Sequence, residues 1–250
     1  MDADKQKIID LFNENVKGKI PDTSSANSRH DGKEGHWLEQ QMGVVANASN
    51  SPDIYGYEMK NTTKSKTSFG DWSADEYIFK GGNAEISRDE FLEIFGKPNE
   101  NKGGRCSWSG EPCPKIGVYN NFGQILEIDE LGNVKAIYSY SEDQRTNKSE
   151  IIPESLQKEN LTLAKWNSES LKDKLERKFN QKGWFKCEKG SDGTYQTINF
   201  GGPINYDNWL QLVREGIVFF DSGMYQTNPR NYSMWRANNN LWESLITSRY

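Results

Sequence analysis

The sequence predicts an α/β protein whose mixed central β-sheet is flanked by helices and shared between two lobes. Residues 5–16 carry apolar side chains at helical spacing. Residues 57–62 alternate with the two-residue period of a strand. Residues 124–129 and 134–138 are apolar-rich and flank a polar turn, which is typical of a β-hairpin. A length of 250 residues suits one large domain or two small lobes.

The other elements follow from capping signals and apolar periodicity. Ser87 and Glu90 form a capping box that starts a helix ending at Gly96. Polar residues 141–160 are expected to link the two lobes. Further helices are expected at 168–180, 207–216 and 241–246, and further strands at 184–188, 195–200 and 217–220.

Composition limits the class of protein. No apolar run approaches the roughly 20 residues that span a bilayer, so no membrane association is expected. The N-terminus lacks the basic-then-apolar pattern of a signal peptide, which predicts a cytoplasmic protein, and its three cysteines then argue against a disulfide framework. The net charge of -5 does not indicate a nucleic-acid partner, but phosphate contacts need only a local basic surface.

The stretch from Ser51 to Lys60 places two carboxylates and an amine on a predicted strand. Glu58 and Lys60 share one face, because successive side chains of a strand point to opposite faces. Asp53 has the opposite parity, and Gly56 permits the turn or bulge that would bring it to the same side. Two acids can hold Mg²⁺, and a neighbouring lysine can orient a water and stabilise charge on a phosphate.

These residues resemble the motif of the PD-(D/E)xK nucleases. Upstream, residues 35–43 are similar to the helix that carries an extra acid, here Glu39, in the branch containing MutH and the MvaI/BcnI-type restriction endonucleases. The resemblance implies Mg²⁺-dependent hydrolysis of DNA, with Asp53 and Glu58 as metal ligands. It implies that Lys60 positions or activates the attacking water, and that Glu39 adds a second-shell or metal contact.

Three stretches supply candidate DNA contacts. Serine, threonine and lysine beside a phosphodiester site are natural phosphate contacts, while arginine and asparagine pair with guanine and adenine. The C-terminal stretch is also similar to the end of the MutH-like enzymes, where it supplies base contacts. The predicted contacts are Lys64 and Lys66, then Arg105, Trp108 and Lys115 in a long loop at 99–115, and finally Arg230, Asn231, Tyr232, Arg236 and Asn238. The alternatives are a solvated loop after Lys60 and a rigid surface loop packed by Trp108.

The sequence therefore predicts a restriction-endonuclease-like fold with two lobes around a DNA cleft. Residues 1–145 are expected to form the catalytic lobe, and residues 146–250 a DNA-recognition lobe that contributes to the shared sheet. The resemblance implies a sequence-specific type II restriction endonuclease that acts on double-stranded DNA as a monomer, with a homodimer as the alternative. Other possibilities are a repair or methyl-directed nicking endonuclease, a non-catalytic DNA-binding protein on a nuclease scaffold, a glycosidase with paired carboxylates, and a surface hairpin with solvated charges.

Overall fold

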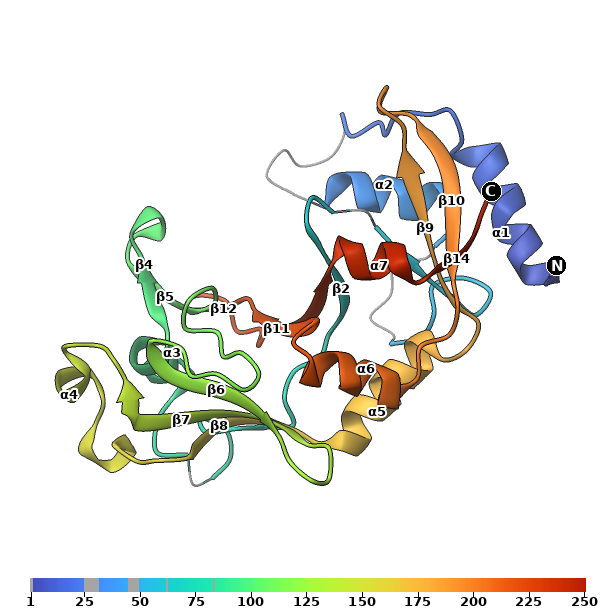
Figure 1. Cartoon of the computed structure of the whole chain (residues 1–250). Coiled ribbons are helices and arrows are strands. Elements are labelled where there is room, and N and C mark those ends of the chain that lie inside the picture. Colours follow the sequence, from blue (N-terminus) through green and yellow to red (C-terminus); the bar gives the residue numbers. More distant parts are fainter. Residues whose placement is uncertain (1, 25–31, 45–49, 62, 83) are drawn as a thin grey trace. The chain divides into compact units, whose positions relative to one another are not determined.

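The computed structural model of the chain describes residues 2–24, 32–44, 50–61, 63–82 and 84–250 (Figure 1). The chain forms two compact units, each assembled from separate stretches. Unit 1 contains Met1–Thr67, Asp173–Tyr206 and Asn238–Tyr250, and unit 2 contains Ser68–Lys172 and Asp207–Ala237. The units are thus interleaved along the chain, whereas the sequence predicts lobes divided after residue 145.

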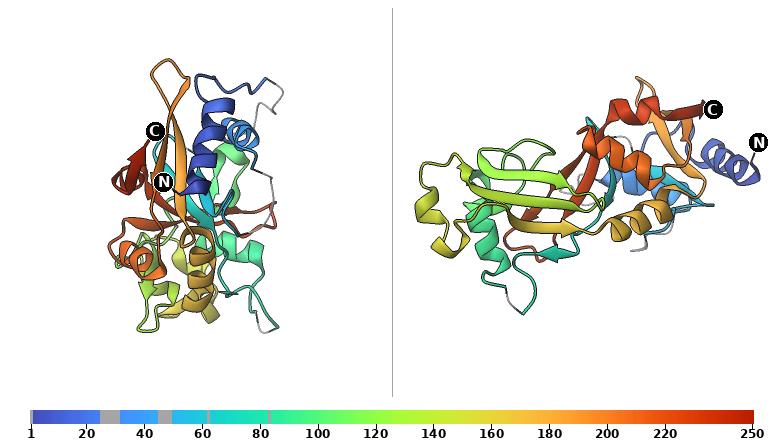
Figure 2. Two further views of the ribbon diagram at one scale, coloured as in Figure 1. Left: turned by 90° about the vertical axis from the view of Figure 1, so that its right-hand side faces the viewer. Right: turned by 60° about the horizontal axis from the view of Figure 1, so that its bottom comes forward.

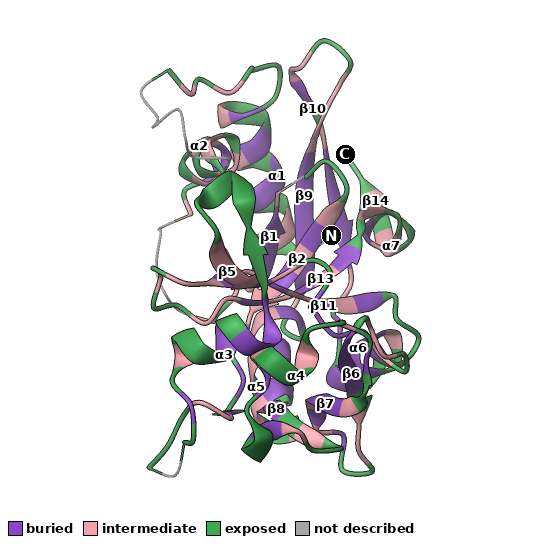
Figure 3. Ribbon diagram, turned by 90° about the vertical axis from the view of Figure 1, so that its left-hand side faces the viewer, coloured by how far each residue is buried: buried purple, intermediate pink, exposed green. Residues whose placement is uncertain are grey.

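Unit 1 is built on a mixed four-stranded sheet in the order β1-β9-β10-β14. β1 pairs in parallel with β9, and β10 is antiparallel to both β9 and β14, which confirms the predicted mixed sheet. The strands are β1 (Tyr57–Lys60), β9 (Gly183–Lys189), β10 (Tyr195–Gly201) and β14 (Ile246–Arg249). β9 lies in the interior of this sheet and is almost entirely buried (Figure 3).

Helices cover both faces of this sheet. On one face, α1 (Ala3–Asn15) and α2 (Lys33–Gln41) pack against the apolar side chains of β1, β9 and β10. The other face is polar along β1 and is covered by the end of α5 (Ser168–Phe179) and by α7 (Asn239–Ser244). Figure 2 shows the sheet between α1 and α2 on one side and α7 on the other. The polar side chains of β1 are thereby enclosed without reaching the apolar core.

Unit 2 contains three small sheets, ordered β11-β13-β2, β12-β5-β4 and β3-β8-β7-β6. Boundaries between the two units fall within β2 and β13. The strands are β2 (Lys66–Asp71), β3 (Glu76–Tyr77), β4 (Lys97–Asn99), β5 (Arg105–Trp108), β6 (Phe122–Ile128), β7 (Val134–Asp143), β8 (Leu161–Trp166), β11 (Val218–Ser222), β12 (Met224–Tyr225) and β13 (Ser233–Asn238). The helices are α3 (Arg88–Phe95), η1 (Glu100–Lys102), α4 (Lys148–Ile151), η2 (Glu154–Leu156) and α6 (Tyr206–Arg214).

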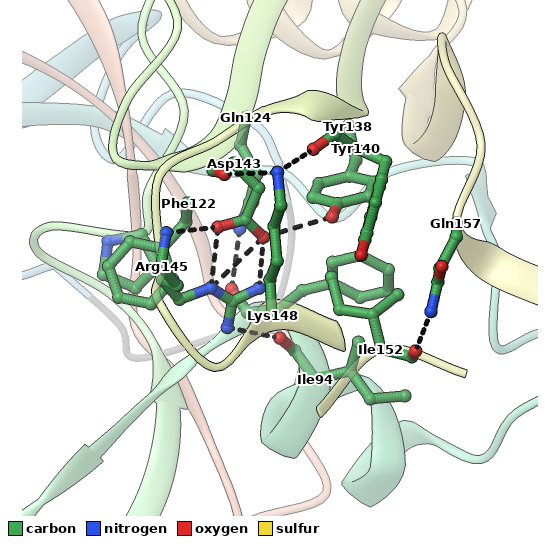
Figure 4. Close-up of polar contacts among 12 residues, drawn as sticks. Ile94, Phe122, Gln124, Tyr138, Tyr140, Asp143, Arg145, Lys148, Ile152 and Gln157 are labelled. Carbon is green, nitrogen blue, oxygen red and sulfur yellow. Dashed lines mark hydrogen bonds and ion pairs between the residues drawn. The ribbon is translucent and has the colours of Figure 1, made fainter. Parts of the chain in front are cut away.

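A buried ion pair anchors the polar segment after β7 (Figure 4). Arg145 binds the Asp143 carboxylate at 2.7 Å and donates to the carbonyl oxygen of Ile94 at 2.8 Å, and Tyr138 donates to the same carboxylate. Lys148 donates to two main-chain carbonyls of β7. Because these bonds satisfy the buried charges, residues 141–160 fold as part of unit 2. The prediction that this segment links two lobes is therefore wrong.

Most predicted elements are present, including the capping box, in which Ser87 accepts from the Glu90 main chain and Glu90 accepts from the Ser87 main chain. The stretch 99–115, predicted as a loop, contains η1 and β5, because β5 finds main-chain partners in β4 and β12. Parts of the polar stretches 21–35 and 47–52 lie outside the described residues. No helix within the described ranges is long and apolar enough to cross a membrane.

Candidate active site

A tight turn brings Asp53 beside Glu58. Ile54 and Tyr57 exchange both main-chain hydrogen bonds, at 3.1 and 2.8 Å. The two residues between them, Tyr55 and Gly56, have φ values of 48° and 82°, as a type I′ hairpin turn requires. Asp53 therefore lies opposite Glu58 across the hairpin, and cross-strand neighbours share a face. The prediction that Gly56 allows Asp53 to reach the face of Glu58 and Lys60 is confirmed.

Two lysines bind one oxygen of the Glu58 carboxylate. The Nζ of Lys60 lies 2.8 Å from Glu58 Oε1, and the Nζ of Lys178 lies 3.1 Å from the same atom. Glu58 is only 2% exposed and its Oε2 has no hydrogen-bond partner among the described residues. A buried carboxylate oxygen without a partner is costly, so this atom marks a place for a ligand.

Burial and like charge disturb the ionisation of Asp53. Burial is the larger cause and the Glu58 charge the second, and together they raise the pKa of Asp53 to about 6. The hydrogen bond that Met59 N donates to Asp53 Oδ2, at 2.9 Å, opposes this rise. Lys60 and Lys178 also oppose it. The two carboxylates are therefore close enough to repel each other, which is the arrangement that a shared divalent cation would relieve.

Lys60 lies in an aromatic enclosure. Its Nζ is 4.8 Å from the centroid of the Phe179 ring and 5.8 Å from that of Trp242. Burial is the main cause that lowers the pKa of Lys60, and the charge of Lys178 lowers it further, against the attraction of Glu58. The free-energy cost of removing a proton from Lys60 is therefore smaller than in water.

Glu39 is connected to the strand through Asn61. Asn61 Nδ2 donates to Glu39 Oε1 at 3.0 Å, and His36 Nδ1 lies 3.9 Å from Glu39 Oε2. Asn61 follows Lys60 directly, and its Oδ1 is buried without a partner among the described residues. Glu39 thus contacts the residue that directly follows Lys60.

A cavity and a groove adjoin this centre in unit 1, and Asn61 lines both. The cavity has a volume of about 30 Å³ and is lined by Lys60, Asn61, Thr67, Lys186, Asn239, Trp242 and Glu243. The groove has a volume of about 470 Å³ and is lined by Glu34, Gly35, Asn61, Thr63, Lys64, Cys187, Glu188, Lys189 and Tyr195. Lys64, a predicted phosphate contact, is exposed at this groove.

A second charged cluster lies next to Lys60 on the same face of the sheet. Lys186 is the parallel register partner of Lys60 and is 5% exposed. Its ammonium binds both Glu188, at 2.6 Å, and Glu243, and Arg249 binds the same two carboxylates. These partners neutralise Lys186, so two buried lysines can be neighbours.

Lys178 and Lys186 belong to the candidate site and are not among the residues that the sequence predicts for it. Lys178 is one of several basic residues on a predicted helix, and such residues are usually solvated. Lys186 alternates with the apolar residues of β9, and this pattern is the one signal that could have found it. A lysine on a strand so thoroughly buried needs a carboxylate partner, which marks it as unusual.

The donor set fits a magnesium ion bound through few protein ligands. Among the described residues, no three side chains of His, Cys, Asp or Glu converge to hold a metal. Asp53 and the unpartnered Oε2 of Glu58 offer two carboxylates. Mg²⁺ sites in phosphoryl-transfer enzymes commonly use one or two carboxylates together with substrate phosphates and water. The residues present therefore fit such an ion.

Comparisons with known proteins decide the family. A family model described as "LlaMI restriction endonuclease" matches residues 16–250. The chain belongs to this restriction endonuclease family. It is 52% identical to the type II restriction enzyme ScrFI of Lactococcus lactis subsp. cremoris over 267 aligned positions, covering 99% of this chain and 98% of that enzyme. The predicted nuclease function is confirmed, and the glycosidase alternative is wrong.

The fold is also that of a restriction endonuclease. The structure of the restriction endonuclease MvaI in complex with its cognate DNA substrate matches with a TM-score of 0.62. The match covers 98% of this chain and 95% of that chain at 13% sequence identity. At this identity the likeness concerns the fold alone, and it confirms the predicted restriction-endonuclease-like α/β class.

The predicted DNA contacts of this family member fall in different environments. Lys115 and Asn238 are exposed, and Lys66 is half-buried. Arg230 is exposed, stacks on Tyr232 at 4.7 Å and binds Asp71 at 2.6 Å. Arg236 lies on β13 with its Nε 3.2 Å from Asp221 Oδ2, and Asn231 Oδ1 accepts from Arg88. The structure holds no DNA, so these roles stay predictions.

Trp108 is a correction to the predicted DNA surface. It is fully buried, its Nε1 donates to Gln124 Oε1 at 2.7 Å, and its ring packs against Phe91 and Phe220. Trp108 reaches the core because it ends β5, whose pairing with β4 and β12 holds it there. The alternative, in which Trp108 packs the stretch against the protein, is therefore correct for this side chain. Trp108 is not a DNA contact.

Proposed function

We propose that the protein is a Mg²⁺-dependent, sequence-specific type II restriction endonuclease that hydrolyses phosphodiester bonds of double-stranded DNA in the cytoplasm. The observation that carries the metal dependence is the buried, unpartnered Oε2 of Glu58 on the same face of the hairpin as Asp53. The relative ScrFI is called a type II restriction enzyme, which supports the same activity here. We propose that the chain acts as a monomer, with a homodimer as the alternative outcome of a light-scattering measurement.

Asp53 and Glu58 would hold the ion, which when bound supplies a Lewis acid and neutralises phosphate charge. Lys60, fixed by Glu58 Oε1, would donate a hydrogen bond to the attacking water or to a phosphate oxygen as negative charge develops. Lys178 binds the same Oε1 and so leaves Oε2 to face the ligand. Glu39 would act through Asn61, by fixing the amide beside Lys60.

The proposed DNA surface combines phosphate and base contacts. We assign phosphate contacts to Lys64, Lys66 and Lys115, because lysine binds phosphate as a point charge and Lys64 lines the groove next to Asn61. We assign base contacts to the arginines and polar residues of the other stretches, namely Arg105, Arg230, Asn231, Tyr232, Arg236 and Asn238.

Cleavage of plasmid DNA tests this function directly. The purified protein is incubated with plasmid and Mg²⁺, and the fragment ends are sequenced. The proposal predicts cuts at one short recurring sequence, no cuts in EDTA, and none with Lys60→Ala, which should still bind DNA. Cleavage of one strand only would favour the nicking alternative, and sequence-specific binding without cleavage would favour the non-catalytic alternative.

A further inference from the structure

In unit 2, the guanidinium group of Arg105 lies over the ring of Tyr225. Its guanidinium carbon is 3.8 Å from the ring centroid, and its Nε is buried without a hydrogen-bond partner among the described residues. Arg230 and Arg236 differ, because a carboxylate binds each of them at 2.6 and 3.2 Å. In the described part of the chain, no carboxylate forms an ion pair with Arg105. Its charge is therefore held in position by a ring and is not neutralised.

Tyr225 is a fixed platform. It lies on β12, in register with Ser107 of β5, and the two strands run side by side (Figure 1). Both Nη atoms of Arg88 donate to the carbonyl oxygen of Tyr225 at 3.3 Å, and Asn228 Nδ2 donates to its hydroxyl oxygen at 3.0 Å. These hydrogen bonds fix the ring on which Arg105 lies, and a contact group that is already fixed loses less entropy on binding.

The main chain next to Arg105 is held as firmly as the platform. Cys106 N donates to Gln226 Oε1 at 2.8 Å, and Gln226 N donates to the carbonyl oxygen of Cys106 at 3.0 Å. The preceding residues form an exposed hairpin tip, in which Gly103 and Gly104 have φ values of 68° and 76°. Arg105 therefore begins β5, directly after the exposed hairpin tip.

We propose that Arg105, stacked on Tyr225, reads a guanine base and is a specificity-determining residue of the enzyme. The inference rests on the proposed function. A guanidinium presents two parallel donors in its plane, which match O6 and N7 of guanine in the major groove. A carboxylate partner would occupy the edge of that plane, and within the described residues no carboxylate forms an ion pair with Arg105. A phosphate contact would need only a charge, which the exposed Lys102 of the same hairpin already supplies.

The test compares Arg105→Lys, Arg105→Ala, Tyr225→Leu and Tyr225→Phe. A matched control is Arg214→Lys, an exposed arginine at the end of α6 in the same unit. Selection of bound sequences from a randomised duplex pool, with Ca²⁺ present to prevent cleavage, measures specificity. Affinity is then followed against salt concentration, and cleavage-site sequencing with Mg²⁺ accompanies both measurements.

Arg105→Lys should relax the preference at one G·C position by about 5- to 150-fold, with the salt dependence unchanged, because the charge is kept. Tyr225→Leu should relax the same position, and Tyr225→Phe and the control should match the wild type. Unchanged specificity in Arg105→Lys overturns the inference. A second result would also overturn it: Arg105→Ala loses DNA affinity equally for all sequences, and the slope of log affinity against log salt concentration becomes smaller by about one. That result would mark a phosphate contact. If the wild type neither cuts nor selects any sequence, the proposed function itself fails.

Discussion

Replacing Asp53 with Asn should stabilise the protein and abolish cleavage. Asp53 has a pKa of about 6 in the folded state and about 3.8 when unfolded. A carboxyl whose pKa is raised on folding favours the folded state fully below pH 3.8, and this contribution is lost as the pH rises through 6. The difference corresponds to about 3 kcal/mol of stability at pH 8, which Asn recovers because it carries no charge. Its oxygen can still accept the hydrogen bond from Met59 N.

The assay is denaturant unfolding of the wild type, Asp53→Asn and a control, Asp10→Asn, which is exposed on α1 in the same unit. The gain from Asp53→Asn should be about 3 kcal/mol at pH 8 and roughly half of that at pH 5. The control should show no pH-dependent gain. Added Mg²⁺ should stabilise the wild type and leave Asp53→Asn unaffected. A gain that stays constant between pH 5 and 8, or a loss of stability at pH 8, would refute the reasoning.

Three further predictions concern residues around Glu58 and Lys60. Lys60→Ala should slow single-turnover cleavage by about 10²–10⁴-fold while DNA affinity in Ca²⁺ is kept, and a parallel loss of affinity would argue against a chemical role. Lys178→Met should slow cleavage by roughly 10- to 100-fold, because Glu58 loses one of the two lysines that bind its carboxylate. Lys178→Arg should recover part of the cleavage rate. A wild-type cleavage rate in Lys178→Met would exclude this role. Glu39→Ala and Asn61→Ala should be non-additive in cleavage rate, with a coupling of about 0.5–3 kcal/mol, and simple additivity would show that the two act independently.

The hairpin that carries Asp53 and Glu58 could be predicted from sequence because its geometry is local. The two-residue period of a strand places Glu58 and Lys60 on one face, and they form an ion pair at 2.8 Å. Gly56 indicated a bend, and the structure adds that Tyr55 also adopts positive φ. That detail decides the register, because a two-residue turn sets Asp53 opposite Glu58. No sequence rule strongly predicts a tyrosine in this conformation, so the turn type was not foreseen.

The rest of the site could not be predicted because it depends on packing between distant segments. Lys178 ends a helix whose other basic residues give the same sequence signal, and only the packing of α5 on the sheet of unit 1 brings it to Glu58. Trp108 illustrates the reverse case. A tryptophan in a glycine-rich stretch that also contains an arginine is equally compatible with a DNA surface and with a core. The pairing of β5 places Trp108 in the core.

The charges around Glu58 bear on how the proposed cation would bind. Two ammonium groups bind Glu58 Oε1, and their charges also limit the rise in the pKa of Asp53. They do not satisfy Oε2, which keeps its desolvation penalty. The folded protein therefore retains an unfavourable free energy at the atom where an ion would bind, and binding removes it. An ion that binds only the folded state adds to the free energy of unfolding. Asp53 and Glu58, which destabilise the protein without an ion, are therefore the residues expected to give it affinity for metal.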